Sequence, residues 1–257
     1  MEKYFEVNEN NNIKCKIYYN DLSNIRNVIL SCHGFAGNKE NAATRRLSKK
    51  VLDSYDDICV ISFDLPCHGK DVRQKLSLSD CMNYYSDMLS YIYRTFNPEN
   101  IYLNATSFGG YLGLKYISEN PNPFRKIVLR CPAINMYEVL NNNILNDESL
   151  KALKSGKSIL VGFDKKMRLT PDFVSDLKNN DITTYDFSNY SEDIMIFQGT
   201  HDELVSFEKV KEFANKNGIE FIDILGADHM FHDPKKMNEF IEYATDFLLN
   251  EDVRSLW

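Results

Sequence analysis

Short, continuously apolar segments recur along the chain and alternate with helical patterns. The segments cover residues 27–32, 58–63, 101–105, 126–131 and 194–198. A strand with apolar side chains on both faces is typical of a parallel sheet that helices cover on both sides. Residues 78–96 give the clearest helical pattern, with apolar side chains every three or four positions. The alternation predicts an α/β fold in which right-handed crossovers connect parallel strands.

The two ends of the chain complete this pattern. Residues 4–7 and 13–19 show the alternation of an antiparallel hairpin at a sheet edge, and residues 220–225 supply one more strand before a final helix that begins at Asp233 and Pro234. Together the segments predict an eight-stranded, mostly parallel sheet flanked by helices. The pattern breaks after the sixth strand. There we predict a compact insertion, or cap, of residues 133–192 within a single domain of residues 1–257.

Composition and charge limit the partners and the compartment that we expect for the protein. A formal net charge of −7 argues against nucleic-acid and anionic-membrane partners, because either would require a basic face. The six cysteines lack C-x-x-C spacing and mostly fall in apolar runs, so we expect reduced core residues. The sequence shows neither a leader-like N-terminus nor an apolar run of membrane-spanning length. We therefore expect a cytoplasmic protein without a stable membrane anchor.

One short stretch, Ala105-Thr106-Ser107-Phe108-Gly109, joins a predicted strand to a predicted helix. A chain that turns so sharply lifts the residue at the apex out of the sheet and needs small residues on either side. This is the geometry of a nucleophile elbow, whose usual pattern is G-x-S-x-G, with Ala105 here in the first Gly position. Ordinary turns and helix caps share parts of the pattern, so the other loops must decide the role of Ser107.

Three further loops carry reactive or polar residues directly after predicted strands: His33-Gly34-Phe35, Asp202 and His229. The carboxyl ends of parallel strands open on one edge of the sheet, where functional residues collect. A serine hydroxyl is a poor nucleophile at neutral pH. It needs a base, a carboxylate that orients the base, and amide donors for the developing oxyanion. These loops can supply all of these groups.

With these residues in this order, the chain resembles the α/β-hydrolases over nearly its full length, apart from the insertion. The resemblance implies that Ser107 is the nucleophile, that His229 is the general base and then the general acid, and that Asp202 fixes the imidazole tautomer. It also implies an oxyanion hole made by the backbone N–H groups of Phe35 and Phe108. No cofactor is implied.

Two other histidines have simpler interpretations. We expect His33 to be a structural hydrogen-bonding residue of the oxyanion loop, because the family assigns it no proton transfer. His68 lies in the loop of residues 64–69, which resembles the D-x-P-G-H-G loop of the family with Cys67 in place of Gly. We expect His68 to be a loop residue. Cys67 is expected to be a buried or loop thiol, because no elbow positions it as a nucleophile.

Asp228 is a rival candidate for the acid of the triad. Its adjacency to His229 in the chain makes the required side-chain hydrogen bond awkward, so Asp202 is preferred. Asp228, His229, His232 and Asp233 also invite a metal-site interpretation, but their spacing fits no common zinc pattern. We therefore predict no metal site.

The substrate is less constrained than the reaction. The insertion and the loop sequences make the chain similar to bacterial carboxylesterases of the cinnamoyl and feruloyl esterase type. We predict a serine carboxylic ester hydrolase for small to medium acyl groups, with cinnamoyl and feruloyl esters among the candidates and a small-molecule ester as its partner. Alternatives are a lysophospholipase or monoacylglycerol lipase, a thioesterase, a serine aminopeptidase and, from another class, a non-catalytic ligand-binding protein of this fold.

Aromatic residues of the insertion bear on this choice. They can line an aromatic acyl pocket or form the small core of the insertion, and we favour the core. The residues are Tyr137, Phe163, Phe173, Tyr185, Phe187 and Tyr190.

Overall fold

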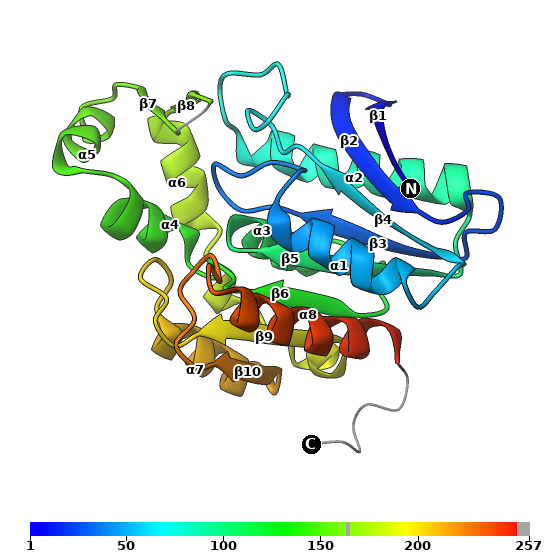
Figure 1. The fold of residues 1–257 in the computed structure, drawn as a ribbon. Helices are drawn as coiled ribbons and strands as arrows, with labels where there is room; N and C mark the ends of the chain where they lie inside the picture. The colour runs from blue at the N-terminus through cyan, green and yellow to red at the C-terminus, as the bar shows by residue number, and fades with distance from the viewer. Residues whose placement is uncertain (163–164, 251–257) are drawn as a thin grey trace.

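The apolar segments form the inner strands of one sheet in the computed structural model, which describes residues 1–162 and 165–250 (Figure 1). Its eight strands are ordered β1-β2-β4-β3-β5-β6-β9-β10. Their bounds are β1 Glu2–Asn8, β2 Asn12–Tyr19, β3 Asn27–Cys32, β4 Ile58–Phe63, β5 Asn100–Thr106, β6 Ile127–Arg130, β9 Ile194–Gly199 and β10 Glu220–Ile224. Strand β2 pairs antiparallel with β1 and β4, and the other pairings are parallel. The predicted sheet and its edge hairpin are confirmed.

The inner strands are buried on both faces, as continuous apolar runs predict. All six residues of β4 are buried, and so is every residue of β6. In register, Cys32 at the end of β3 pairs with Phe63 of β4 on one side and with Ala105 of β5 on the other. The carboxyl ends of these strands therefore lie at the same edge of the sheet.

Helices cover the two faces of the sheet in separate sets (Figure 1). Helices α1 (Ala42–Leu52) and α8 (Pro234–Leu249) pack on one face. Helices α2 (Leu78–Phe96), α3 (Phe108–Glu119) and α7 (Phe207–Asn217) pack on the other. The ends of these helices follow local sequence signals: Asp233 caps α8 before Pro234, and Asn97 ends α2 in the left-handed conformation with φ 43°.

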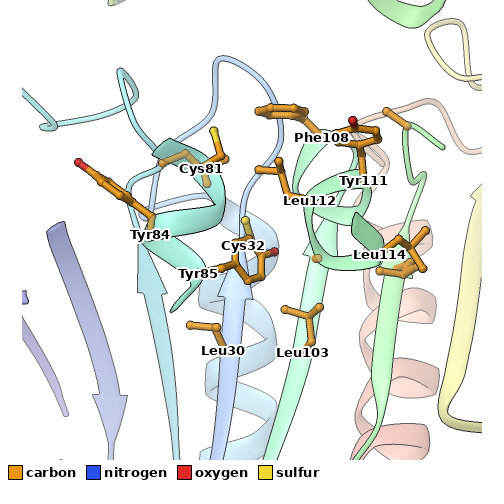
Figure 2. Close-up of a cluster of buried hydrophobic side chains, with 14 of the residues drawn as sticks. Leu30, Cys32, Cys81, Tyr84, Tyr85, Leu103, Phe108, Tyr111, Leu112 and Leu114 are labelled. Carbon is orange, nitrogen blue, oxygen red and sulfur yellow. The ribbon is translucent and has the colours of Figure 1, made fainter. Parts of the chain in front are cut away.

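A cluster of buried side chains fixes the start of α3 above the sheet (Figure 2). Leu30 and Cys32 of β3 and Leu103 of β5 lie beneath residues of α2 and α3 in this view. The hydroxyl of Tyr85 in α2 donates a hydrogen bond to the carbonyl oxygen of Gly109 at 3.1 Å. This hydrogen bond ties α2 to the first turn of α3.

The segment between β6 and β9 contains short elements, most of which gather at the end of the sheet where β6 ends, while the last one lies at the opposite end, directly before β9 (Figure 1). They are α4 Met136–Val139, the π turn η1 Leu140–Ile144, α5 Asp147–Lys154, β7 Ile159–Val161, β8 Met167–Leu169, α6 Pro171–Asn179, and the 3-10 turns η2 Ile182–Thr184 and η3 Ser188–Asp193. The side-chain amide of Asn143 donates to the carbonyl oxygen of Leu204 at 2.7 Å. The backbone N–H of Leu76 donates to the carbonyl oxygen of Arg168 at 3.0 Å. The insertion thus contacts loops that follow the carboxyl ends of β4 and β9, while its division from the rest of the domain remains a prediction.

Helix α5, strand β8 and the 3-10 turns η2 and η3 were not predicted from the sequence. Helix α5 buries only Leu153, so its apolar pattern is too short to show a helical period. Strand β8 has three residues and pairs with β7 in a small separate sheet. Residues 158–163 read as strand-like in the sequence, and the structure has strand β7 over Ile159–Val161; Phe163 lies outside the described residues.

Candidate active site

The backbone of Ser107 adopts an unusual conformation between β5 and α3, with φ 52° and ψ −116°. A non-glycine residue with positive φ is strained by about 1–3 kcal/mol and persists only where its neighbours hold it. Three backbone hydrogen bonds do so: its N–H donates to Arg130 at 3.0 Å, and its carbonyl accepts from Tyr111 and Ala133 at 3.1 Å each. Ser107 therefore stands at the apex of a rigid strand-to-helix turn, as the elbow pattern predicts.

Glycines on both sides of the turn allow this close approach. A Cβ atom on Gly34 would lie 3.1 Å from the Cβ of Ser107, which places the His33-Gly34 loop directly against the serine. A Cβ on Gly109 would lie 2.6 Å from the carbonyl oxygens of Cys32 and His33, so no larger residue fits there without displacing the chain. Ala105, in the first Gly position of the pattern, is buried inside β5. Alanine is small enough at that position.

The backbone N–H groups of Phe35 and Phe108 are available as oxyanion donors. Their aromatic rings lie 5.9 Å apart in an edge-to-face contact, so the two residues are neighbours across the turn. Within residues 1–162 and 165–250, neither N–H donates a hydrogen bond to a protein acceptor. An N–H group that starts a helix has no acceptor in the preceding turn, so the Phe108 donor is a consequence of the fold.

Asp202 and His229 come together at the ends of β9 and β10. The Nδ1 atom of His229 lies 2.9 Å from Oδ2 and 3.0 Å from Oδ1 of Asp202. The same carboxylate accepts hydrogen bonds from Nε2 of Gln198 at 2.7 Å and from the backbone N–H groups of Leu204 and Val205 at 2.9 and 2.8 Å. The predicted partner of His229 is therefore in place, and it is held from several sides.

The hydrogen bonds of Asp202 decide its charge and the tautomer of His229. Burial raises the pKa of the Asp202 carboxyl, but the hydrogen bonds from His229, Val205 and Leu204 outweigh burial and hold the pKa below its ordinary value. An ionised carboxylate only accepts hydrogen bonds, so Nδ1 of His229 carries the proton. The other ring nitrogen, Nε2, is then free to accept one. This is the form that a general base requires.

The rival acid, Asp228, has a different partner. Its Oδ2 lies 2.7 Å from Nδ1 of His232, and its Oδ1 accepts from the backbone N–H of His232 at 3.0 Å. The side chain of Asp228 thus closes a local turn with an exposed histidine. The preference for Asp202 over Asp228 agrees with this geometry.

His33 uses both ring nitrogens on the backbone. Its Nε2 accepts from the N–H of Leu65 at 3.1 Å, so its Nδ1 carries the proton and donates to the carbonyl of Gly34 at 2.7 Å. Burial also lowers the pKa of His33. A neutral ring with two backbone partners holds the loop of residues 33–35 in place, in line with its predicted structural role.

The loop after β4 adopts its turn although Cys67 replaces the usual glycine. Cys67 has φ 69°, in the region that favours glycine, and its N–H donates to Asp71 at 2.8 Å. Burial raises the pKa of the Cys67 thiol to about 12, so the thiolate that would act as a nucleophile does not form at neutral pH. Burial similarly lowers the pKa of His68 to about 3, and its Nδ1 lies 2.8 Å from the carbonyl of Pro66. Both are loop residues, as predicted.

Residues at the end of β6 also reach the triad candidates, and the sequence did not single them out. The sulfur of Cys131, a carboxylate oxygen of Asp202 and a ring nitrogen of His229 lie within 4.8 Å of one another. Thiol, carboxylate and imidazole are possible metal ligands. Burial, however, raises the pKa of Cys131 well above its ordinary value, and Asp202 already accepts four N–H donors. The cluster therefore fits a hydrogen-bonded Asp202–His229 pair better than a metal site.

A cleft of about 430 Å³ lies between the insertion and these loops. It joins Phe35 of the oxyanion loop to Leu204, two residues after Asp202, and its other walls include Ile144, Leu145 and Leu160 of the insertion. The aromatic residues that were considered for an acyl pocket do not line it: Phe173 and Phe187 are buried, and Tyr137, Tyr185 and Tyr190 pack against the core. They are core residues, as favoured from the sequence, but of the large core that the insertion shares with α2, α3 and α7 and not of a separate small one. Phe163 lies outside the described residues.

The sequence also matches a family model that is described as alpha/beta hydrolase fold. The match covers residues 27–164, more than half of the 257 residues. The chain belongs to the α/β-hydrolase family. A search of curated proteins finds no match to this α/β-hydrolase.

Solved structures share the fold of this α/β-hydrolase at low identity. Est1E from Butyrivibrio proteoclasticus with ferulic acid bound gives a TM-score of 0.76 at 15% identity, covering 96% of this chain and 98% of that one. A soluble variant of monoglyceride lipase from Saccharomyces cerevisiae, in complex with a substrate analogue, gives 0.72 at 14%, with 96% and 94% covered. An alpha-beta serine hydrolase homologue from Coxiella burnetii gives 0.61 at 18%, with 96% and 97% covered. These likenesses show the fold alone.

None of the helices in the described part of this α/β-hydrolase has both the length and the apolar character needed to cross a bilayer.

Because the backbone of Ser107 is strained, we expect the wild-type serine to lower the stability of this α/β-hydrolase even though its activity requires it. The Ser107→Gly variant is expected to gain about 1 kcal/mol in the free energy of unfolding, because glycine adopts positive φ without steric cost. Urea denaturation measures the gain. The control is Ser155→Gly, at an exposed residue with φ −85°, where glycine is expected to destabilise slightly. A Ser107→Gly variant less stable than the wild type would contradict strain at the elbow.

Gly199, at the end of β9, lies against the loop that carries His229. A Cβ there would lie 2.3 Å from the carbonyl oxygen of Ala227 and 3.1 Å from that of Asp228. Gly199→Ala is therefore expected to displace this loop, with a loss of about 1–3 kcal/mol in stability and about ten-fold or more in kcat. Urea denaturation and steady-state kinetics measure both effects.

The control for this change is Gly156→Ala. Gly156 has φ 83° and open space around its Cβ position, so alanine strains only the local backbone. We expect it to lower stability without changing kcat. Equal kcat values in the two variants would show that Gly199 does not position the His229 loop.

Proposed function

We propose that this α/β-hydrolase is a serine carboxylesterase that cleaves esters of small to medium acyl groups through an acyl-enzyme. The observation that carries the proposal is the Asp202–His229 hydrogen bond at the edge of the sheet where Ser107 stands on its strained turn. A serine at such a turn, at the same edge of the sheet as a correctly protonated imidazole, suits acyl transfer. The family membership supports the same reaction class.

The proposed reaction begins when Ser107 attacks the carbonyl carbon of the ester. Nε2 of His229 takes the hydroxyl proton, and Asp202 stabilises the imidazolium that forms. The N–H groups of Phe35 and Phe108 donate to the oxyanion of the tetrahedral intermediate. The imidazolium then gives its proton to the leaving alkoxide, and the acyl group remains on Ser107. Water attacks this acyl-enzyme by the same route and restores the serine.

The cleft beside the site favours apolar, uncharged or anionic acyl groups. Most of its described walls are apolar side chains, and its described lining contains one charged side chain, that of Lys166, and no carboxylate. A serine aminopeptidase needs a carboxylate for the amino group of its substrate. The cleft therefore supports an esterase over a peptidase.

A monoacylglycerol lipase or lysophospholipase is the second candidate. Leu160, on the short strand β7, lines the cleft and is exposed to 61% of its maximum, so the cleft opens beside an apolar surface. Long acyl chains require such an apolar path. The fold likeness to a monoglyceride lipase supports this candidate, and the likeness to Est1E with ferulic acid bound supports cinnamoyl and feruloyl esters.

A panel of substrates tests the proposal. It combines p-nitrophenyl esters of two to twelve carbons, methyl ferulate, a monoacylglycerol, an acyl thioester and an aminoacyl p-nitroanilide, each with wild type and Ser107→Ala. We expect turnover of the short and medium esters by the wild type and no turnover of the anilide. Preference for the monoacylglycerol would support the lipase. Binding of esters without hydrolysis would point to a non-catalytic protein.

A further inference from the structure

Arg130, the last residue of β6, is a buried cation beside the proposed triad. Only 3% of the residue is exposed. Its Nη1 donates to the backbone carbonyl of His229 at 3.3 Å, and its Nε is buried without a hydrogen-bond partner in the described residues. Its guanidinium carbon lies 5.1 Å from the ring centre of Phe231 and 5.8 Å from that of Phe240. The guanidinium of Arg130 therefore contacts one carbonyl oxygen and the faces of two aromatic rings.

The other buried cations of the described chain are neutralised differently. Lys16, Lys39 and Lys115 are equally buried, and each has a carboxylate within 3.1 Å, from Glu2, Asp64 and Glu119 respectively. Arg130 has no carboxylate within 4.0 Å among the residues described. Burying a charge without an ionic partner is costly. Its position therefore calls for an explanation beyond packing.

The position of Arg130 links two parts of the proposed site. Its backbone carbonyl accepts the N–H of Ser107 at 3.0 Å, while its side chain holds the backbone of His229. Phe231, under the guanidinium, has φ 54°, so the loop that carries His229 is itself held in a strained conformation. Resting on the proposed function, we propose that Arg130 is a positioning residue that fixes the His229 loop against the nucleophile elbow and keeps the Asp202–His229 pair from taking up a second proton.

The proposed effect of Arg130 on proton uptake follows from the charges that surround Asp202 and His229. The titratable groups there are the Cys131 thiol, Glu203, whose carboxylate lies 3.4 Å from the N–H of His229, Asp228 and Arg130. Burial lowers the pKa of Arg130, while the thiol of Cys131 and the carboxylates of Asp202 and Asp228 raise it in part. Arg130 is the one cation among these groups. A nearby positive charge opposes proton uptake by its neighbours.

Three substitutions of Arg130 separate its positioning of the His229 loop from the effect of its charge. Arg130→Lys keeps the charge, Arg130→Gln keeps an N–H donor without the charge, and Arg130→Met removes both. We expect kcat for p-nitrophenyl butyrate to fall about ten-fold in Arg130→Met with KM within two-fold. We also expect the acidic limb of kcat/KM to move to higher pH by about half a unit or more in the Gln and Met variants. The limb of Arg130→Lys should stay in place.

Histidine NMR provides a readout that needs no turnover. The pH at which the Asp202–His229 pair takes up a proton, followed by the ring signals of His229, should rise in Arg130→Gln and Arg130→Met. The matched control is Lys16→Met, which removes an equally buried cation on β2 and should leave both profiles unchanged. If Arg130→Met does not fold, Arg130→Gln decides the result.

The outcomes distinguish this inference from the proposed function. A wild type without esterase activity would refute the proposed function, while the NMR titration would still test Arg130. Neutral variants that keep the wild-type kcat, acidic limb and NMR midpoint would overturn the role of Arg130. Loss of thermal stability alone, with those three quantities unchanged, would also overturn it and would show that the residue only stabilises the fold.

Discussion

Replacing Ser107 by alanine is expected to reduce hydrolysis of p-nitrophenyl butyrate at least about 10⁴-fold. The variant keeps the backbone of the elbow, because alanine resembles serine in size, but it lacks the oxygen that attacks the ester. The oxyanion donors and the cleft remain, so substrate still binds. Steady-state kinetics and labelling by a fluorophosphonate measure the loss, and the label should react with the wild type at one site per chain.

The control for this prediction is Ser155→Ala, at an exposed serine of the insertion. It is expected to keep wild-type kinetics and labelling. Circular dichroism and a thermal melt confirm that both variants fold. Full activity in Ser107→Ala would refute the proposed nucleophile.

The sequence was sufficient to predict the sheet and the triad candidates because both depend on local patterns. Continuous apolar runs identify strands that are buried on both faces, and parallel strands bring the residues after their carboxyl ends together. Ser107 and Asp202 each follow such a run, and His229 follows the predicted edge strand of residues 220–225, so their common edge could be predicted before any distance was known. The same reasoning placed Phe35 beside Ser107.

The contacts of Arg130 and Cys131 with the site could not be predicted from the local sequence. Both end an apolar run, and the sequence predicted only that the strand is buried. The cation of Arg130 is covered by Phe231 and Phe240, about a hundred positions later, and no local pattern encodes this contact. An arginine at the end of a buried strand was the available signal, because such a residue needs a partner.

The short elements of the insertion escaped prediction for another reason. Helix α5 and strand β8 are too short for a hydrophobic period, and their positions depend on contacts with loops of the main sheet. Arg168 illustrates this dependence, since its backbone pairs with the segment around Lys75. Tertiary contacts of this kind cannot be deduced from the local sequence.

Replacing Asp202 by asparagine is expected to lower kcat/KM about 10⁴-fold at pH 7. The asparagine amide can satisfy the N–H groups of Leu204 and Val205 only by turning its own NH₂ toward His229. His229 then accepts at Nδ1 and carries its proton on Nε2, so it cannot take the proton of Ser107. Nitrophenyl ester kinetics measure the loss, and Asp223→Asn, at an exposed carboxylate of β10, is the control.

The same variant tests the charge of Asp202 through stability. Because hydrogen bonds hold its pKa below the ordinary carboxyl value of about 3.9, its contribution is fully present above that value and is lost as pH falls through the lower folded pKa. Asp202→Asn should therefore be less stable than the wild type by about 1–3 kcal/mol at pH 7, and the difference should shrink as the pH falls below about 3. Urea denaturation at pH 7 and at a pH below about 3 measures the difference in the free energy of unfolding. A difference that is the same at both would mean that Asp202 is protonated in the folded protein, and the imidazole would then lack the anion that stabilises it during acyl transfer.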